Sequence, residues 1–431
     1  MEVRRFKAGS EELKNFLQSN LEDLKKYEAG VAQIGQEVKE RGDQAVFDFT
    51  LKFDKAHITR ENFRVSPEEI EEAYSLVDEE YIYALEAAIE NITAFHEKQL
   101  KNSWWATDER GNITGQIYRP LERVGIYVPG GTAAYPSSVL MNAIPALVAG
   151  VKEIVMVSPP DAKGKMNPYT LVAAAELGLD EIYKMGGAHA VFALAWGTET
   201  VRKVDLISGP GNIYVTLAKK MVYGDVDIDM LAGPSEILIV ADSKADPVYL
   251  AADMMSQAEH DILARSILVT DSSELIDKVE EELKRQIKLL SRKEIIEKAL
   301  SSYGALILAS SMDEACEVAN EVAPEHLELM VENPFDYLSK IKNAGAIFMG
   351  QYTPEPVGDY YAGPNHILPT GGTARFYSPV TVDTFMKSSS IIYYSRAGIK
   401  ASADDIIKLA EVEGLTAHAN AVRVRKERLN D

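Results

Sequence analysis

The stretch GIYVPGGTAAYPSSV, residues 125–139, predicts a buried strand, a glycine turn and a helix in succession. The alternation continues to residue 212 through five further segments: VKEIVMVSPP (151–160), NPYTLVAAAELG (167–178), DEIYKMGG (180–187), AHAVFALAWG (188–197) and KVDLISGPGN (203–212). Strands that alternate with helices of about a dozen residues are typical of a parallel, doubly wound sheet. The sequence therefore predicts one α/β module over residues 124–235.

A second alternation of the same kind occupies residues 236–375. Its predicted strands are EILIVAD (236–242), SILVT (266–270), ALILA (305–309), LELMV (327–331) and AIFMG (346–350), with helices between them. The predicted fold class is therefore α/β, with two incomplete Rossmann-like doubly wound modules and a helical extension at each end.

The helical extensions suggest how the chain divides into domains. We expect residues 1–25 to form an N-terminal helical segment and residues 26–123 to pack with 236–375 as a first α/β domain. Residues 124–235 would form the second domain, and residues 376–431 a C-terminal helical tail. The segment WWATDERGNITGQIYRP (104–120) stands out as a predicted hairpin with its turn at residues 110–112.

Composition narrows the class of protein. The chain has 431 residues and a formal net charge of −21, which argues against a nucleic-acid partner. We expect a cytoplasmic protein with no membrane partner, because residues 1–13 lack a secretory apolar core and the most apolar run, 137–151, is too short to span a bilayer. Cys316 is the only cysteine, which excludes disulfides and thiolate zinc sites, and its amphipathic helical surroundings predict a buried residue.

Several titratable residues stand at positions where chemistry is plausible. Asp253, Gln257 and His260 share one face of a predicted helix that begins after Asp246, and they indicate either a metal site or a helix that ends in polar residues. Glu325 and His326 precede an apolar strand, which is typical of an acid/base pair near a ligand crevice or of a solvated loop.

Two further segments carry candidate residues. The loop VGDYYAGPNHILPTGGTARF (357–376) is rich in glycine and proline and offers Asp359 and His366 as competing functional groups. Near the end of the chain, Glu413 and His418 flank Gly414 in a break between helices, so the tail could cap a site of its own subunit or of a partner.

Three glycine turns between strand and helix predict a phosphate or nucleotide site. They are VPGG (128–131), MGGAHA (185–190) and SGPGN (208–212). Glycine lets backbone amides approach a phosphate at a helix N-terminus, but tight strand-to-helix turns need glycine in any case. The GxGxxG fingerprint of dinucleotide-binding folds is absent.

Taken together, these segments resemble the histidinol dehydrogenase family from about residue 123 to residue 423. The resemblance is carried by GIYVPGG, ISGPGN, LAGPSE, SQAEHD, APEHLEL, VGDYYAGPNHILPTGGTARF and EGLTAHANAV, in this order. It implies the NAD-dependent oxidation of L-histidinol to L-histidine through L-histidinal, the last step of histidine biosynthesis, by an intertwined homodimer with one zinc ion per subunit. Residues 124–235 would bind NAD, and the tail would reach the partner subunit.

The resemblance also implies roles for single residues. Glu325 and His326 would be the acid/base pair, and the metal would be held by Gln257, His260 and Asp359 of one subunit and His418 of the other, which leaves His366 a structural residue. The residues implied to contact substrate are Ser235, Gln257, His260, His326, Asp359, Glu413 and His418; those implied to face the cofactor are Tyr127, His189 and Asn212. His189 stands where many relatives carry glutamine.

Two alternatives remain at the level of sequence. One is a related zinc- and NAD-dependent dehydrogenase that acts on another small alcohol, such as a sulfonated diol. The other is a metal-dependent hydrolase without cofactor, against which the glycine turns argue. For a dehydrogenase, the position of Cys316 within a predicted helix disfavours a thiohemiacetal intermediate and favours a hydrate formed with water activated by Glu325.

Overall fold

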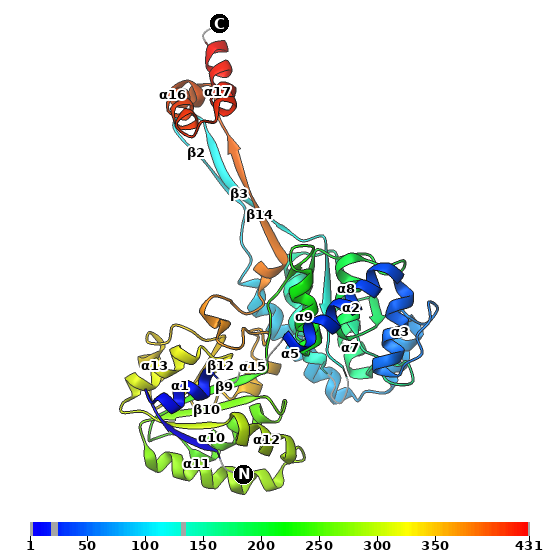
Figure 1. Cartoon of the computed structure of the whole chain (residues 1–431), viewed down its shortest axis with the longest axis vertical. Helices are drawn as coiled ribbons and strands as arrows, with labels where there is room; N and C mark the ends of the chain where they lie inside the picture. Colours follow the sequence, from blue (N-terminus) through cyan, green and yellow to red (C-terminus); the bar gives the residue numbers. More distant parts are fainter. Residues whose placement is uncertain (1–2, 19–24, 131–134, 430–431) are drawn as a thin grey trace. The chain divides into compact units, whose positions relative to one another are not determined.

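The computed structural model describes residues 3–18, 25–130 and 135–429 (Figure 1). The chain divides into two compact units, the first formed by residues 1–99 and 121–385 and the second by residues 100–120 and 386–431. Among the described residues, no helix is both long enough and apolar enough to cross a membrane. Gly131, the last residue of the turn VPGG, lies outside the described residues.

The first unit contains a five-stranded parallel sheet in the order β6-β5-β4-β7-β8. Its strands are β4 (Arg123–Tyr127), β5 (Glu153–Ser158), β6 (Glu181–Lys184), β7 (Leu206–Ser208) and β8 (Asp227–Ile228). They alternate with α6 (Pro136–Ala149), α7 (Pro168–Glu176), α8 (Gly187–Trp196) and α9 (Ile213–Val222). The alternation predicted from residue 125 onward is therefore confirmed, and the buried strand β4 lies at the centre of the sheet, as expected for a continuous apolar run.

The N-terminal helices cover this sheet rather than the second one. They are α2 (Lys25–Arg41), α3 (Asp43–Asp54), α4 (Pro67–Ser75) and α5 (Glu79–Glu97); α2 packs on α8 and α9, α4 on α7, and α5 on α6. The predicted packing of residues 26–123 on residues 236–375 is corrected accordingly, although α5 also contacts the loop at Gly363.

The reason for this packing is the apolar surface of α8, which is buried on nearly every side. A helix that is apolar all round needs cover on the face that does not meet its sheet. α2 supplies that cover with Val31, Ile34 and Val38. Gly35 allows a close approach of the two helices, because a Cβ at this position would lie 2.9 Å from the ring of Phe192.

The first unit also contains a six-stranded parallel sheet in the order β1-β11-β10-β9-β12-β13. Its strands are β1 (Arg4–Lys7), β9 (Glu236–Ala241), β10 (Arg265–Thr270), β11 (Ala305–Leu308), β12 (His326–Met330) and β13 (Ala346–Met349). Its helices are α1 (Glu11–Gln18), α10 (Pro247–Ala258), α11 (Ser273–Gln286), α12 (Lys293–Tyr303), α13 (Met312–Val322), α14 (Phe335–Leu338) and α15 (Glu355–Tyr360), with 3₁₀ turns η1 (Ile287–Leu289), η2 (Thr373–Arg375) and η3 (Val382–Phe385).

Two expectations for this region need correction. Residues 4–7 form a strand and not a helix, because four residues are too few to show a period and β1 is defined by its pairing with β11, in which Arg4 lies opposite Ala305. The loop 357–376 is less irregular than expected, since its first residues belong to α15. Gly358 is required there: a Cβ at this position would lie 2.6 Å from the ring of Phe348.

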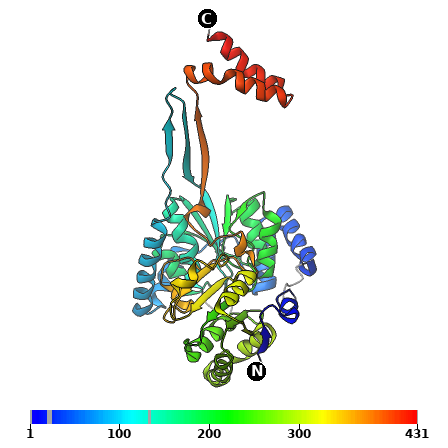
Figure 2. The same ribbon diagram turned by 90° about the vertical axis from the view of Figure 1, so that its left-hand side faces the viewer.

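The second unit is built on three antiparallel strands in the order β14-β3-β2, which Figure 2 shows side by side. The predicted hairpin is confirmed as β2 (Trp104–Thr107) and β3 (Ile113–Pro120), with Asp108 accepting hydrogen bonds from the amides of Arg110 and Asn112 in the turn. The tail is not wholly helical, because β14 (Met386–Tyr393) precedes α16 (Arg396–Val412) and α17 (Thr416–Arg428). MKSSSIIY lacks apolar alternation, so this strand is defined by its partner β3.

Candidate active site

The predicted acid/base pair lies at the amino ends of two neighbouring parallel strands. His326 is the first residue of β12 and pairs with Ile237 of β9, while Glu325 directly precedes the strand. Ligands of open α/β sheets usually bind at the carboxyl ends of the strands. The helix α10 ends at the same edge of the sheet, because it leads into β10, and this brings Gln257 and His260 close to His326.

His326 is buried and has one ring nitrogen that is free to accept a proton. Its Nδ1 lies 3.1 Å from the carbonyl oxygen of Glu236, so it carries the proton and donates to that oxygen. Its Nε2 faces Asp359 Oδ1 at 3.7 Å, too far for a hydrogen bond, and neither atom has another hydrogen-bond partner in the described part of the chain. Nε2 is therefore the ring nitrogen through which His326 could exchange a proton with a bound molecule.

Carboxylates surround this imidazole. Burial acts to lower the pKa of His326, but the charges of Glu355, Glu325 and Asp359 outweigh burial and raise that pKa well above its usual value. His326 Nδ1 lies 3.7 Å from Glu325 Oε2 and 3.9 Å from Glu355 Oε1. These charges therefore favour the protonated form of the ring, so His326 must first lose the proton on Nε2 before it can act as a general base.

Glu325 is held in place by the neighbouring strand. Its Oε2 accepts a hydrogen bond of 2.9 Å from the backbone amide of Glu236, and Oε1 is left to act on another group. Burial raises the pKa of Glu325 to about 8, while the positive charge of His326 opposes that shift. A carboxyl with a pKa near neutrality can both take and return a proton.

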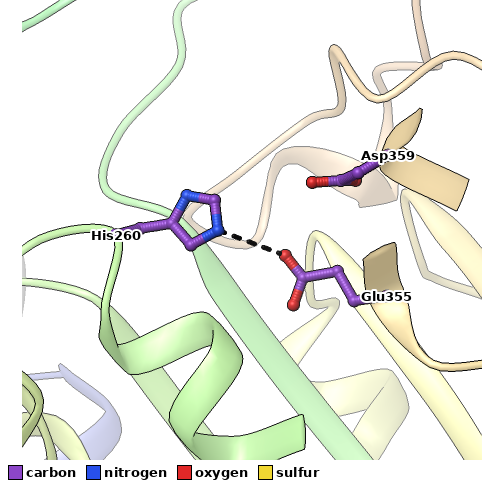
Figure 3. Close-up of side chains that lie close together, drawn as sticks. All are labelled: His260, Glu355 and Asp359. Atoms are coloured by element: carbon purple, nitrogen blue, oxygen red, sulfur yellow. Dashed lines mark ion pairs between the residues drawn. The ribbon is translucent and has the colours of Figure 1, made fainter. Parts of the chain in front are cut away.

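A candidate metal site is formed by His260, Glu355 and Asp359. One ligand atom from each residue lies within 4.8 Å of the others, and Figure 3 shows the three side chains converging, with His260 Nε2 3.8 Å from Glu355 Oε1. Glu355 is buried, whereas the side chain of His260 is 37% exposed, so the group is open on one side. Imidazole nitrogen and carboxylate oxygen suit zinc.

Gln257 is fully buried beside this group. Its amide nitrogen is assigned to the side of Glu355, to which it then donates at 3.0 and 2.8 Å, because an oxygen at that position would face acceptors only. The amide oxygen, the only atom of glutamine that can bind a metal, is then free of Glu355. The predicted ligands Gln257, His260 and Asp359 thus lie together, while His418 belongs to the second unit.

The sequence reasoning missed Glu355. Burial raises the pKa of this residue to about 7, and its backbone amide donates to Glu328 Oε1 at 3.1 Å. Glu328 is itself buried, and burial followed by the charge of Asp253 raises the pKa of Glu328 well above its usual value. The sequence did contain one feature that could have identified Glu355. Glu355 and Asp359 are spaced so that both carboxylates lie on one face of a helical turn.

The remaining candidates occupy less central positions. His366 donates from Nδ1 to the backbone carbonyl of Asp359 at 3.1 Å, so it supports the loop. Ser235 directly precedes β9, where its carbonyl accepts a hydrogen bond from Arg265. In the second unit, the exposed Glu413 and His418 line one surface hollow between α16 and α17.

The three predicted cofactor residues lie at the carboxyl ends of strands in the five-stranded sheet or on the helices that follow them. Tyr127 ends β4, and its hydroxyl accepts a hydrogen bond of 2.9 Å from the amide of Gly187. Asn212 caps α9 by accepting from Tyr214 and Val215. His189 is buried on α8, with its Nε2 3.2 Å from the hydroxyl of Thr50.

The glycine turn after β7 contacts the end of β4. Gly209 has a φ of +127°, and a Cβ there would lie 2.1 Å from the carbonyl oxygen of Tyr127. Only glycine fits so close an approach. A buried ion pair between Lys219 and Asp229 holds the turn, because Lys219 donates to the Gly209 carbonyl and Asp229 accepts from the Gly209 amide.

The amino-acid sequence was compared with protein-family models and with known proteins, and the matches below carry the same family name. A family model described as histidinol dehydrogenase matches residues 17–426. The chain is 59% identical to the histidinol dehydrogenase of Heliobacterium mobile over 414 residues, which is 96% of this chain and 97% of that protein. It is 56% identical to the histidinol dehydrogenase of Clostridium acetobutylicum over 427 residues, 98% of this chain and 99% of that protein.

A solved structure shows the same similarity in three dimensions. The histidinol dehydrogenase of Elizabethkingia anophelis superposes with a TM-score of 0.94 at 40% sequence identity, and the match covers 100% of this chain and 99% of that one.

Proposed function

The chain belongs to the histidinol dehydrogenase family, and we propose that it oxidises L-histidinol through L-histidinal to L-histidine at the amino ends of β9 and β12, with NAD as electron acceptor and zinc as metal. The observation that carries this proposal is the arrangement around His326: a buried imidazole with one free nitrogen, next to Glu325 and to three possible metal ligands. Residues 124–235 would bind NAD.

The donor atoms fit a zinc ion. His260 and Asp359 offer a nitrogen and an oxygen ligand beside Glu355, and Asp359 Oδ1 has no hydrogen-bond partner among the described residues. Gln257 would add its amide oxygen if the metal, rather than Glu355, set the orientation of the amide. When bound, zinc would supply Lewis-acid polarisation and would orient the amine and imidazole of the substrate. His418 of a second subunit would complete the ligand set, and the tail, with Glu413, would place it there in a homodimer.

Glu355 gives a direct test of the metal site. Glu355→Gln keeps the shape of the side chain but removes a buried charge next to His260 and Asp359, so we expect zinc affinity to fall by about 10- to 100-fold. Competition with a chromogenic chelator measures that affinity without reference to activity. The control is Glu332→Gln, which removes an exposed carboxylate elsewhere. Equal affinity in both variants would show that Glu355 does not act on the metal.

In the first oxidation, His326 would take the hydroxyl proton. The Nδ1–H group donates to the Glu236 carbonyl, which fixes the ring and leaves Nε2 as the accepting atom. The imidazolium formed in this way would be stabilised by Glu355, Glu325 and Asp359 while the hydride would go to NAD.

In the second oxidation, the aldehyde must first gain an oxygen atom. Cys316 is buried within α13, and burial raises the pKa of its thiol, so it is poorly placed as a nucleophile. Glu325 is bound at Oε2 by the Glu236 amide and can use Oε1 to remove a proton from water that adds to the aldehyde. As water adds, protonated His326 would return its proton to the aldehyde oxygen, which gives a neutral hydrate and a neutral imidazole. His326 could then take a hydroxyl proton of the hydrate as base, while the second hydride would go to a second NAD.

Substrate choice tests the function as a whole. We expect steady-state formation of NADH with L-histidinol and little or none with a sulfonated propanediol of similar size. A higher kcat/KM for the diol would assign the chain to a related dehydrogenase with another substrate. If turnover of either compound produced no NADH, the dehydrogenase assignment itself would fail.

A further inference from the structure

The carboxylate of Asp54 has no role in the chemistry described above. Asp54 is the last residue of α3 and is only partly exposed. Its Oδ2 is buried and lacks a hydrogen-bond partner in the described part of the chain, and burial alone raises its pKa to about 6. A buried acceptor without a donor is rare in native proteins and calls for an explanation, such as a ligand that supplies the donor.

Asp54 lies beside the proposed cofactor residues. Burial chiefly raises the pKa of Tyr127 to about 12, and the nearby Asp54 carboxylate adds to that shift. The neighbouring Phe53 is 49% exposed, and its ring contacts the ring of His189 with centroids 6.1 Å apart. The end of α3 therefore meets the carboxyl end of β4 and the start of α8, where Tyr127 accepts from Gly187.

The place where a ligand would bind follows from the order of the strands. In the sequence β6-β5-β4-β7-β8 the direction of winding reverses between β4 and β7. Open α/β sheets bind ligands outside the carboxyl ends of their strands at such a reversal. Tyr127 and Ser208 end the two strands, and Asp54 lies close enough to Tyr127 for its charge to act on that residue.

The five-stranded sheet does not supply the usual acidic residue itself. In dinucleotide-binding sheets a carboxylate near the end of the second strand accepts hydrogen bonds from a ribose. Here the corresponding strand β5 ends in Ser158 and is followed by Pro159 and Pro160. The next carboxylate, Asp161, accepts hydrogen bonds from the amides of Lys163 and Lys165 in its own turn.

The two lysines nearest to Asp54 in the sequence do not form ion pairs with its carboxylate. Lys52 lies with its Nζ over the rings of Phe49 and Phe53, at 5.9 and 5.2 Å from their centroids. Lys55 donates to the carbonyl of Lys52. In the described part of the chain, neither ammonium forms an ion pair with Asp54, so its carboxylate is available to neutral donors and repels anions.

We propose that Asp54 accepts hydrogen bonds from the hydroxyls of the adenosine ribose of the dinucleotide and excludes the 2′-phosphate of NADP. This inference rests on the cofactor site proposed above. A carboxylate and a ribose diol form charge-assisted hydrogen bonds, whereas a carboxylate and a phosphate monoester repel one another in a partly buried site. Asp54 is thus assigned as the residue that selects NAD over NADP.

The test compares kcat/KM for NAD and NADP in the purified full-length enzyme. We expect Asp54→Ser to raise the ratio of NADP to NAD efficiency by about 10- to 100-fold, because one charge-assisted hydrogen bond is lost for NAD and one repulsion for NADP. The control is Asp48→Asn, which removes an exposed carboxylate from the same helix and should leave the ratio unchanged. A ratio that changes less than twofold in Asp54→Ser would overturn the proposal.

If the Asp54→Ser variant does not fold, the proposal can still be tested by binding measurements on the unmodified enzyme. We expect NAD lacking the 2′-hydroxyl of its adenosine ribose to bind about tenfold more weakly than NAD; equal binding would overturn the proposal. Calorimetric titration with NADH and NADPH measures selectivity without turnover. If the enzyme formed no NADH from L-histidinol yet bound NADH far more tightly than NADPH, the proposed reaction would fail while the role of Asp54 would stand.

Discussion

Replacement of His326 by glutamine is expected to lower kcat for L-histidinol by about 10³-fold, the usual loss when a general base is removed. Glutamine can still donate a hydrogen bond to the Glu236 carbonyl, so β9 and β12 should keep their geometry. It cannot accept a proton from the substrate. Initial rates of NADH formation at saturating substrate and cofactor measure the effect.

Two comparisons separate chemistry from structural damage in this variant. Zinc content should remain that of the unmodified enzyme, because His326 is not among the proposed ligands. The control His57→Gln changes an exposed histidine of a loop and should keep full activity. A loss of less than tenfold in His326→Gln would exclude His326 as the general base.

Replacement of Glu325 by glutamine is expected to impair the two oxidations unequally. The amide oxygen can still accept from the Glu236 amide, but the side chain cannot take a proton from water. We expect oxidation of L-histidinal to slow by about 100- to 1,000-fold and oxidation of L-histidinol to L-histidinal by less than tenfold. Single-turnover measurements with each compound resolve the two steps.

The pH dependence of aldehyde oxidation is a second test of the role of Glu325. Because burial raises the pKa of Glu325 to about 8, its basic form grows as the pH rises through that value. The rate of aldehyde oxidation should therefore increase over this range in the unmodified enzyme and lose that increase in Glu325→Gln. The control Cys316→Ala should keep near-normal activity. Equal slowing of both steps in Glu325→Gln, or a large loss in Cys316→Ala, would contradict the hydrate route.

The parts of the fold that follow from local sequence were predicted well. The run from residue 125 to residue 212 specifies strand, turn and helix by its own apolar pattern, and Asp246 caps the helix that was predicted to begin after it. The strands β1 and β14 were missed because they are set by their partners β11 and β3. The apolar face of α2 predicted burial but could not indicate which sheet would cover it.

In the candidate site, too, some features follow from local sequence and others depend on residues that are distant in the sequence. His260 was predicted on the same helix as Gln257 but lies in the turn after α10, where its amide donates to the Gln257 carbonyl at 3.3 Å, so three-residue spacing still keeps the pair together. Glu325 and His326 are adjacent in the sequence. The meeting of these pairs with Asp359 was predicted by family resemblance and not by spacing. Glu355 was missed because its importance depends on burial against Gln257 and Glu328, which no local pattern encodes.

The number of NADH molecules formed per L-histidinol tests the central claim most directly. With NAD in excess and a limiting, known amount of L-histidinol, absorbance at the end of the reaction gives this number. Two NADH per substrate, with L-histidine as product, are predicted for a four-electron oxidation completed at one site. A yield of one NADH with accumulation of L-histidinal, or a yield of none, would contradict the account.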